Sequence, residues 1–104
     1  MTAQVDVLAT YHDVSELFGA LSSPVRAAIV HQLAERDHAV HELVVSLGLT
    51  QPLISQHLRV LRGARLVTTV RKGREVTYRL ADEHVAHVFL DAFNHTQETP
   101  RSVD

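Results

Sequence analysis

The chain of 104 residues has the length of one small domain, and with 45% hydrophobic and 21% charged residues its composition excludes a disordered protein. The absence of cysteine excludes disulfides, thiol nucleophiles, cysteine–zinc sites and iron–sulfur clusters. No apolar run approaches the roughly 20 residues of a membrane span, and the N-terminus lacks the pattern of a signal peptide, so we expect a cytoplasmic protein without a membrane partner. The formal net charge of −2 by itself argues against a nucleic-acid partner.

The first half of the chain predicts helices. Residues 1–12 are predicted to be an N-terminal arm, 13–98 the domain itself, and 99–104 a tail. Apolar residues at helical spacing predict a first helix over 13–21. Ser23 followed by Pro24 is a typical helix start, because the serine caps the helix and the proline has no N–H that needs a partner, and this helix is predicted to end at Glu35. A polar break over 36–38 follows.

The second half predicts two short helices and a hairpin. Gly48 is predicted to end a helix over 40–47 in a left-handed cap, and Thr50 to cap the next helix, over 51–62, which Gly63 ends. The apolar period then changes from about 3.6 to 2, which predicts strands over 66–70 and 75–80 joined by a basic turn. A last helix is predicted from 82 to 95 or slightly beyond. The predicted fold class is mainly α with a small β-hairpin, a winged helix-turn-helix.

Charge is segregated along the chain. Between Gln51 and Leu80 seven basic residues stand against one acidic residue, a net charge of +6, whereas the rest of the chain carries −8. Since phosphate binding needs local positive potential, this segment predicts a nucleic-acid partner despite the acidic total. The alternative is a basic surface patch without a ligand.

The helix over 51–62 and the hairpin tip offer side chains suited to double-stranded DNA. Glutamine can bond the edge of adenine, serine can bond either groove edge, and arginine or lysine can bind phosphate. The predicted DNA-binding residues are Gln51, Ser55, Gln56, Arg59, Arg62, Arg71, Lys72 and Arg74. His57 is either a phosphate contact or a half-buried structural histidine.

Several segments together carry a family resemblance, which covers roughly residues 14–98. They are residues 21–26, 40–44, 51–61 (QPLISQHLRVL), 66–67, 73–74 and 78–80. This combination resembles the ArsR/SmtB family of metal-responsive bacterial repressors. The resemblance implies a homodimer that regulates transcription by binding a palindromic operator, which metal binding releases, and it implies operator contacts from Gln51, Ser55 and Gln56.

The last predicted helix is rich in histidine and carboxylate side chains, the strong metal ligands that remain without cysteine. His84 and His95 share a helix face but lie about 16 Å apart along its axis, so one chain cannot place both on one ion. In an antiparallel pair of such helices, Asp82 and His84 of one chain meet His95 and Glu98 of the other. Two-fold symmetry then predicts two tetrahedral sites of two nitrogen and two oxygen ligands, suited to Zn²⁺ or Co²⁺.

The spacing of these four ligands also resembles the interfacial zinc site of the family's zinc-sensing branch. Because the helix over 40–47 has no cysteine, the arsenic, cadmium or lead branch does not fit. His87 and Asp91 match no part of the pattern, and His87 is left for an alternative Ni²⁺ or Co²⁺ site. By resemblance, His95 would pass the metal signal toward Arg65. The alternative is that the whole set is a polar stripe on a solvated helix face.

The remaining histidines and the other function classes are less informative. His12, His31, His38 and His41 are scattered, and we expect them at the surface. Two alternatives remain. One is a repressor that does not respond to metal, and the other is a metal-buffering protein that uses the helix-turn-helix only as a scaffold. An enzyme is not expected, because four protein ligands leave no position for a reactive water and no serine or threonine nucleophile arrangement or small organic substrate site is evident.

Overall fold

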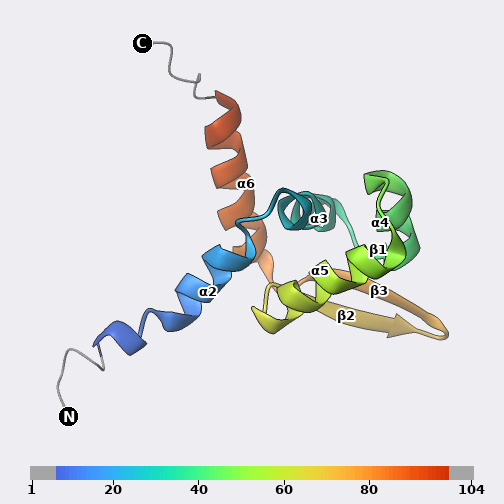
Figure 1. Ribbon diagram of the computed structural model, residues 1–104, viewed down its shortest axis with the longest axis horizontal. Helices are drawn as coiled ribbons and strands as arrows, with labels where there is room; N and C mark the ends of the chain where they lie inside the picture. Colours follow the sequence, from blue (N-terminus) through green and yellow to red (C-terminus); the bar gives the residue numbers. More distant parts are fainter. Residues whose placement is uncertain (1–6, 99–104) are drawn as a thin grey trace.

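The computed structural model describes residues 7–98 (Figure 1). The helices are α2 (His12–Ala20), α3 (Pro24–Glu35), α4 (Val40–Leu47), α5 (Gln51–Gly63) and α6 (Glu83–Glu98), and the strands are β1 (His38–Ala39), β2 (Val67–Lys72) and β3 (Glu75–Leu80). The predicted fold class is confirmed: a mainly helical domain carries a small antiparallel sheet. The first six residues of the predicted arm and the tail over 99–104 lie outside the described residues.

The start and stop signals in the sequence are confirmed where they depend on local chemistry. Ser23 Oγ accepts a hydrogen bond from Arg26 N at 3.3 Å at the start of α3, and Thr50 Oγ1 accepts one from Leu53 N at 3.4 Å at the start of α5. Gly48 ends α4 with φ of 68°, in the left-handed region that glycine tolerates. The caps at Gly48 and Thr50 fix the turn between α4 and α5, and therefore the direction in which α5 leaves it.

The sheet contains one more strand than the sequence predicts. β2 and β3 form the expected hairpin, and β1 pairs with β3 through His38 and Tyr78, which gives the order β1-β3-β2. The prediction of a polar break over 36–38 is therefore wrong at His38. This residue is 6% exposed, and its Nδ1 donates a hydrogen bond to the Arg36 carbonyl at 2.8 Å. His31 is also not a free surface residue, because its ring packs against Phe93 with centroids 4.4 Å apart.

The hydrophobic core joins every element of the domain. Its fully buried members come from α3, α4, α5 and the residue before β2, and the base of α6 closes it. The buried residues of this core include Ile29, Val30, Leu33, Leu43, Ile54, Leu58, Leu61 and Leu66, and α6 adds Val85 and Phe89. Because α5 packs its apolar face into this core, its opposite face is held rigidly toward solvent.

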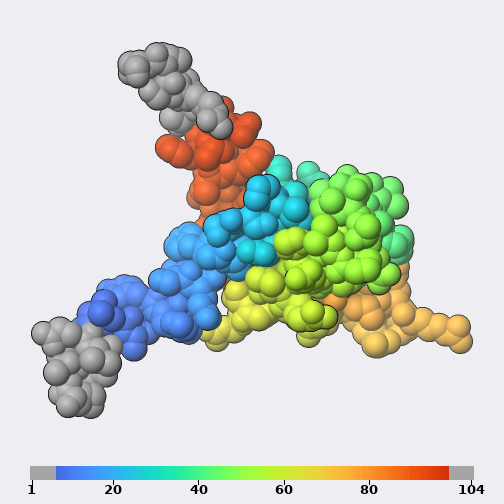
Figure 2. Space-filling model, in the orientation of Figure 1, coloured from blue at the N-terminus to red at the C-terminus, as the bar shows by residue number. Residues whose placement is uncertain are grey.

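The terminal helices extend from the body on the side opposite the hairpin tip, as Figures 1 and 2 show. Both expose large apolar side chains, among them Val14 and Phe18 of α2 and Val88 of α6. The apolar face of α6 is thus only partly covered: Val85 and Phe89 are buried, but Val88 is 43% exposed. No helix in the described part of the chain is long and apolar enough to span a membrane.

Candidate functional site

Helix α5 and the hairpin hold the predicted DNA-binding side chains on accessible surface. The α5 residues Gln51, Gln56, Arg59 and Arg62 are exposed, and Ser55 is half-buried. The exposed residues of the hairpin tip are Arg71, Lys72 and Arg74. Figure 1 shows the tip projecting beyond the rest of the molecule. This arrangement offers a protruding helix for one DNA groove and a basic wing for the next.

The ion pairs of the structure divide the basic segment into two classes. Within residues 7–98, none of the five basic residues predicted to bind DNA is paired with a carboxylate. By contrast, Arg65 Nη2 lies 2.8 Å from Asp13 Oδ2, and Arg79 Nη2 lies 2.9 Å from Asp37 Oδ2. The positive charge that remains available to phosphate is therefore concentrated on α5 and the hairpin tip.

His57 has a structural contact that the sequence did not reveal. Arg26 Nη1 lies 3.3 Å from His57 Nδ1, and Arg26 Nε donates to the Ala20 carbonyl at 2.7 Å. Because a guanidinium only donates hydrogen bonds, Nδ1 is the acceptor in this contact. Arg26 thus ties α5 to the end of α2, and the geometry favours the structural interpretation of His57.

The four predicted metal ligands lie in two groups at opposite ends of α6. Asp82 Oδ1 accepts a hydrogen bond from Val85 N at 3.1 Å, which caps the helix and leaves the second carboxylate oxygen for another ligand. His84, His95 and Glu98 are exposed. One chain does not bring the two groups together. Two imidazoles and two carboxylates suit Zn²⁺, so these residues fit the metal only if a second α6 supplies the other half of each site.

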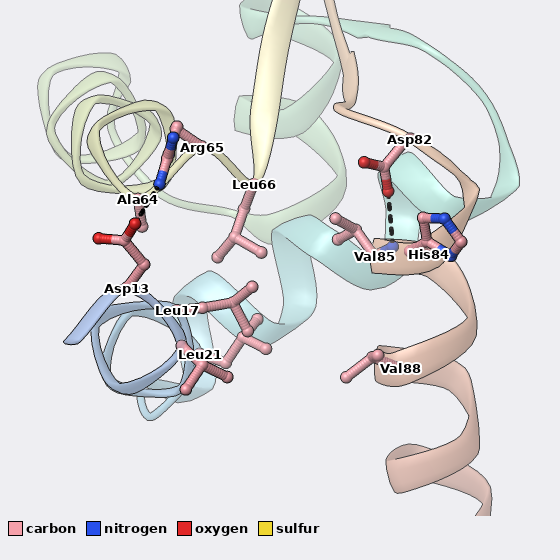
Figure 3. A pocket seen from close by; sticks show the side chains of 11 residues that line it. Asp13, Leu17, Leu21, Ala64, Arg65, Leu66, Asp82, His84, Val85 and Val88 are labelled. Carbon is pink, nitrogen blue, oxygen red and sulfur yellow. Dashed lines mark hydrogen bonds and ion pairs between the residues drawn. The ribbon is translucent and has the colours of Figure 1, made fainter. Parts of the chain in front are cut away.

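A hollow of about 330 Å³ lies between α2 and α6, beside the first of these groups. Figure 3 shows Asp82 and His84 on the α6 side and the Asp13–Arg65 ion pair on the other, with Leu66 between them. Arg65 follows the end of α5 and has φ of 63°, an uncommon value for a residue with a side chain. The hollow therefore connects the start of α6 with the end of α5.

A second group of metal-ligating side chains occurs on α2. His12, Asp13 and Glu16 offer ligand atoms that lie within 4.8 Å of one another, and all three residues are exposed. His12 Nε2 is 3.3 Å from Glu16 Oε2, and Asp13 is already paired with Arg65. From the sequence alone, His12 is one of several scattered histidines expected at the surface. The spacing of four residues between His12 and Glu16 was the signal that could have found this group.

The sequence was compared with protein-family models and with known proteins to find the family of this chain. The model for "Bacterial regulatory protein, arsR family" matches residues 23–69. The chain is 58% identical over 83 residues to the HTH-type transcriptional repressor SmtB of Mycobacterium tuberculosis. The aligned region covers 80% of this chain and 62% of SmtB. It is 37% identical over 84 residues to the HTH-type transcriptional regulator NmtR of the same organism, covering 81% of this chain and 70% of NmtR. The chain belongs to the arsR family.

A solved structure supports the fold of this arsR-family chain. The homodimeric winged helix-turn-helix DNA-binding domain of Mb0332 from Mycobacterium bovis, described as a possible ArsR-family transcriptional regulator, matches with a TM-score of 0.81. The identity is 26%, and the match covers 93% of this chain and 91% of that one. The winged helix-turn-helix prediction is confirmed, and SmtB and NmtR are transcriptional regulators rather than enzymes. The chain spans about three fifths of the length of SmtB.

Proposed function

We propose that this arsR-family protein is a zinc-responsive transcriptional repressor that binds operator DNA as a homodimer in the cytoplasm. Metal binding between the last helices of the two subunits releases the DNA. The observation that carries the proposal is the separation of two surfaces. Unpaired basic side chains cover α5 and the hairpin tip, whereas the exposed metal ligands lie on α6, across the hollow that reaches the end of α5.

In the proposed complex α5 enters the major groove. Gln51 and Gln56 reach base edges there, Arg59 and Arg62 contact the backbone, and the wing follows the duplex into the next groove. Two copies of α5 must match half-sites that are one helical turn apart or a multiple of it. Any change in the relative orientation of the two subunits therefore changes the affinity for DNA.

The exposed apolar side chains of the terminal helices support the dimer. Burying a valine or phenylalanine side chain stabilises an interface by about 1.5–3 kcal/mol, and Val14, Phe18 and Val88 are at least 43% exposed in the single chain. Pairing two copies of α6 in antiparallel orientation would cover Val88 and bring Asp82 and His84 to the partner subunit's His95 and Glu98. The homodimeric Mb0332 domain has the same fold.

The metal response depends on this interface. A bound Zn²⁺ would supply a rigid tetrahedral link between the two copies of α6. Asp82 and His84 border one side of the hollow and Arg65 the other, and the core residues Leu66 and Val85 also line it. Through these two side chains, a displacement at the start of α6 would reach the end of α5. A coupling of about 1–3 kcal/mol is typical of such systems and corresponds to about 5- to 150-fold in DNA affinity.

The second candidate is a winged-helix repressor that responds to Ni²⁺ or Co²⁺, or to no metal. Exposed His87 on α6 and the His12–Asp13–Glu16 group on α2 favour it, because each could serve an ion with a different coordination. A metal-buffering protein would bind the ion without binding DNA.

Fluorescence anisotropy with the promoter DNA upstream of the protein's own gene tests the proposal. At fixed salt and with a chelator present we expect tight binding, which Zn²⁺ weakens by about tenfold or more. His84→Ala and His95→Ala should bind DNA but lose the zinc response. His12→Ala, which removes a ligand from the group on α2, should keep the zinc response, and its loss would favour the site on α2. Tight binding that Zn²⁺ leaves unchanged would exclude zinc as the signal, and absence of DNA binding would exclude the repressor.

A further inference from the structure

A groove between α5 and the hairpin combines basic and hydroxyl side chains without an acid. Its volume is about 530 Å³, and it is lined by Ser55, Arg59, Arg62, Gly63 and Tyr78. Two guanidinium groups share this hollow, and no carboxylate is among the lining residues. Like charges brought together in this way repel each other unless an anion lies between or beside them.

The polar groups of the groove are unused by the rest of the described chain. Within residues 7–98, neither Arg59 nor Arg62 forms an ion pair, and the hydroxyl groups of Ser55 and Tyr78 form no hydrogen bond with protein atoms. Nor is any of these atoms buried without a partner, so all of them remain accessible to a ligand. The groove therefore offers two cations and two hydroxyl donors to one anionic group.

Rigid elements hold both walls of the groove. Ser55, Arg59 and Arg62 are spaced by four and three residues, so they form one stripe along the side of α5. Tyr78 lies on β3, the central strand, where it is paired with His38 of β1 and Thr69 of β2. The backbone that carries the phenol is thus paired with a strand on both sides, so it loses little freedom when a ligand binds.

The position of the groove identifies the ligand. A winged helix-turn-helix places its second helix in the major groove and its wing in the adjacent minor groove, and one sugar–phosphate strand separates those two grooves. That strand must pass between α5 and the hairpin. We propose that Ser55, Arg59, Arg62 and Tyr78 form a binding site for a phosphate of this strand, with the Tyr78 hydroxyl as a donor. The site rests on the proposed DNA-binding function and assigns Ser55 to the backbone instead of to a base.

A phosphate ligand and a base ligand differ in how binding depends on sequence and salt. Tyr78→Phe removes one hydroxyl group that faces a charged partner, so we expect about tenfold weaker binding to the operator and to an unrelated duplex alike. The slope of affinity against salt should not change, because tyrosine is uncharged. Arg62→Gln should instead reduce that slope by about 0.9, because the variant neutralises one phosphate fewer. Tyr11→Phe, which changes the other tyrosine of the chain, is the matched control and should behave as the wild type.

Anisotropy titrations on both duplexes over a series of salt concentrations, with thermal unfolding as a check on folding, decide the question. Ser55→Ala provides a second test that leaves the sheet intact, and it too should weaken both duplexes equally. Unchanged affinity of Tyr78→Phe and Ser55→Ala would overturn the site, as would weakening confined to the operator, which indicates base contact. If the two variants bound inorganic phosphate more weakly than the wild type but bound DNA equally well, the groove would be a site for free anions, and the proposal would be overturned. A wild type that binds neither duplex would instead refute the repressor function itself.

Discussion

Substitutions of Asp82 can separate a helix cap from a metal ligand. Its Oδ1 accepts a hydrogen bond from Val85 N at 3.1 Å, so Asp82→Ala removes the cap of α6 and should destabilise the metal-free protein by about 1 kcal/mol. In a domain of this size that free energy lowers Tm by about 4–8 °C. Asp82→Asn keeps a capping oxygen and should stay within about 0.5 kcal/mol of the wild type, although it also lacks the negative charge that a metal ion requires.

Two assays read these roles independently. Urea unfolding with a chelator, at one protein concentration because dimer stability depends on it, measures the cap. Competition with a chromogenic zinc chelator measures the ligand, and both variants should lose more than the roughly 10- to 100-fold in affinity that removal of an outer-shell partner costs. Wild-type zinc affinity in Asp82→Asn would refute Asp82 as a ligand. Unchanged unfolding of Asp82→Ala would refute the cap.

Three further predictions concern stability. Gly48→Ala should destabilise the protein by about 1 kcal/mol, because Gly48 has φ of 68°. Gly63→Ala has equally open space but lies at a helical position, so it should stabilise the protein by up to about 1 kcal/mol. Equal effects of the two substitutions in urea unfolding would contradict this reasoning. The hydrogen bond from Ala39 N, helped by the charge of Arg36, lowers the pKa of Glu42. The ionised Glu42 therefore stabilises the fold above its ordinary pKa, and this stabilisation is lost as the pH falls through the lowered pKa. The difference in stability between the wild type and Glu42→Gln seen near pH 7 should therefore shrink as the pH is lowered below the ordinary carboxyl range. Arg26→Met should cost about 1.5–3 kcal/mol, and a variant as stable as the wild type would exclude the bridge to His57 and Ala20.

The parts of the fold that the sequence predicted are those governed by neighbouring residues. Ser23 with Pro24, Gly48 and Thr50 each act within one turn of the chain, and the structure has each cap where it was expected. Strand β1 was missed because two residues are too few to show a period, and because its partner Tyr78 is forty residues away. The left-handed residue after α5 is Arg65 and not a glycine, which no propensity rule indicates.

The candidate sites were predictable to different degrees. The basic residues proposed for DNA were recognisable from the charge pattern, but only the structure separates them from Arg65 and Arg79, whose acids come from distant segments. Tyr78 was not singled out, since its place in the groove depends on the packing of β3 beside α5. The metal ligands of α6 rest on a spacing argument that requires two chains, and that arrangement stays a prediction.

Mixed dimers of two variants show whether two subunits share each metal site. His84→Ala and His95→Ala homodimers each lack a histidine in both sites. A dimer with one subunit of each kind has one site without histidines and one site with all four ligands. The two variants are mixed, exchanged and titrated with Zn²⁺ while DNA release is followed by anisotropy. If each metal site is shared by two subunits, mixing should restore one high-affinity Zn²⁺ per mixed dimer together with zinc-dependent release of DNA. No recovery on mixing, in subunits shown to have exchanged, would contradict it.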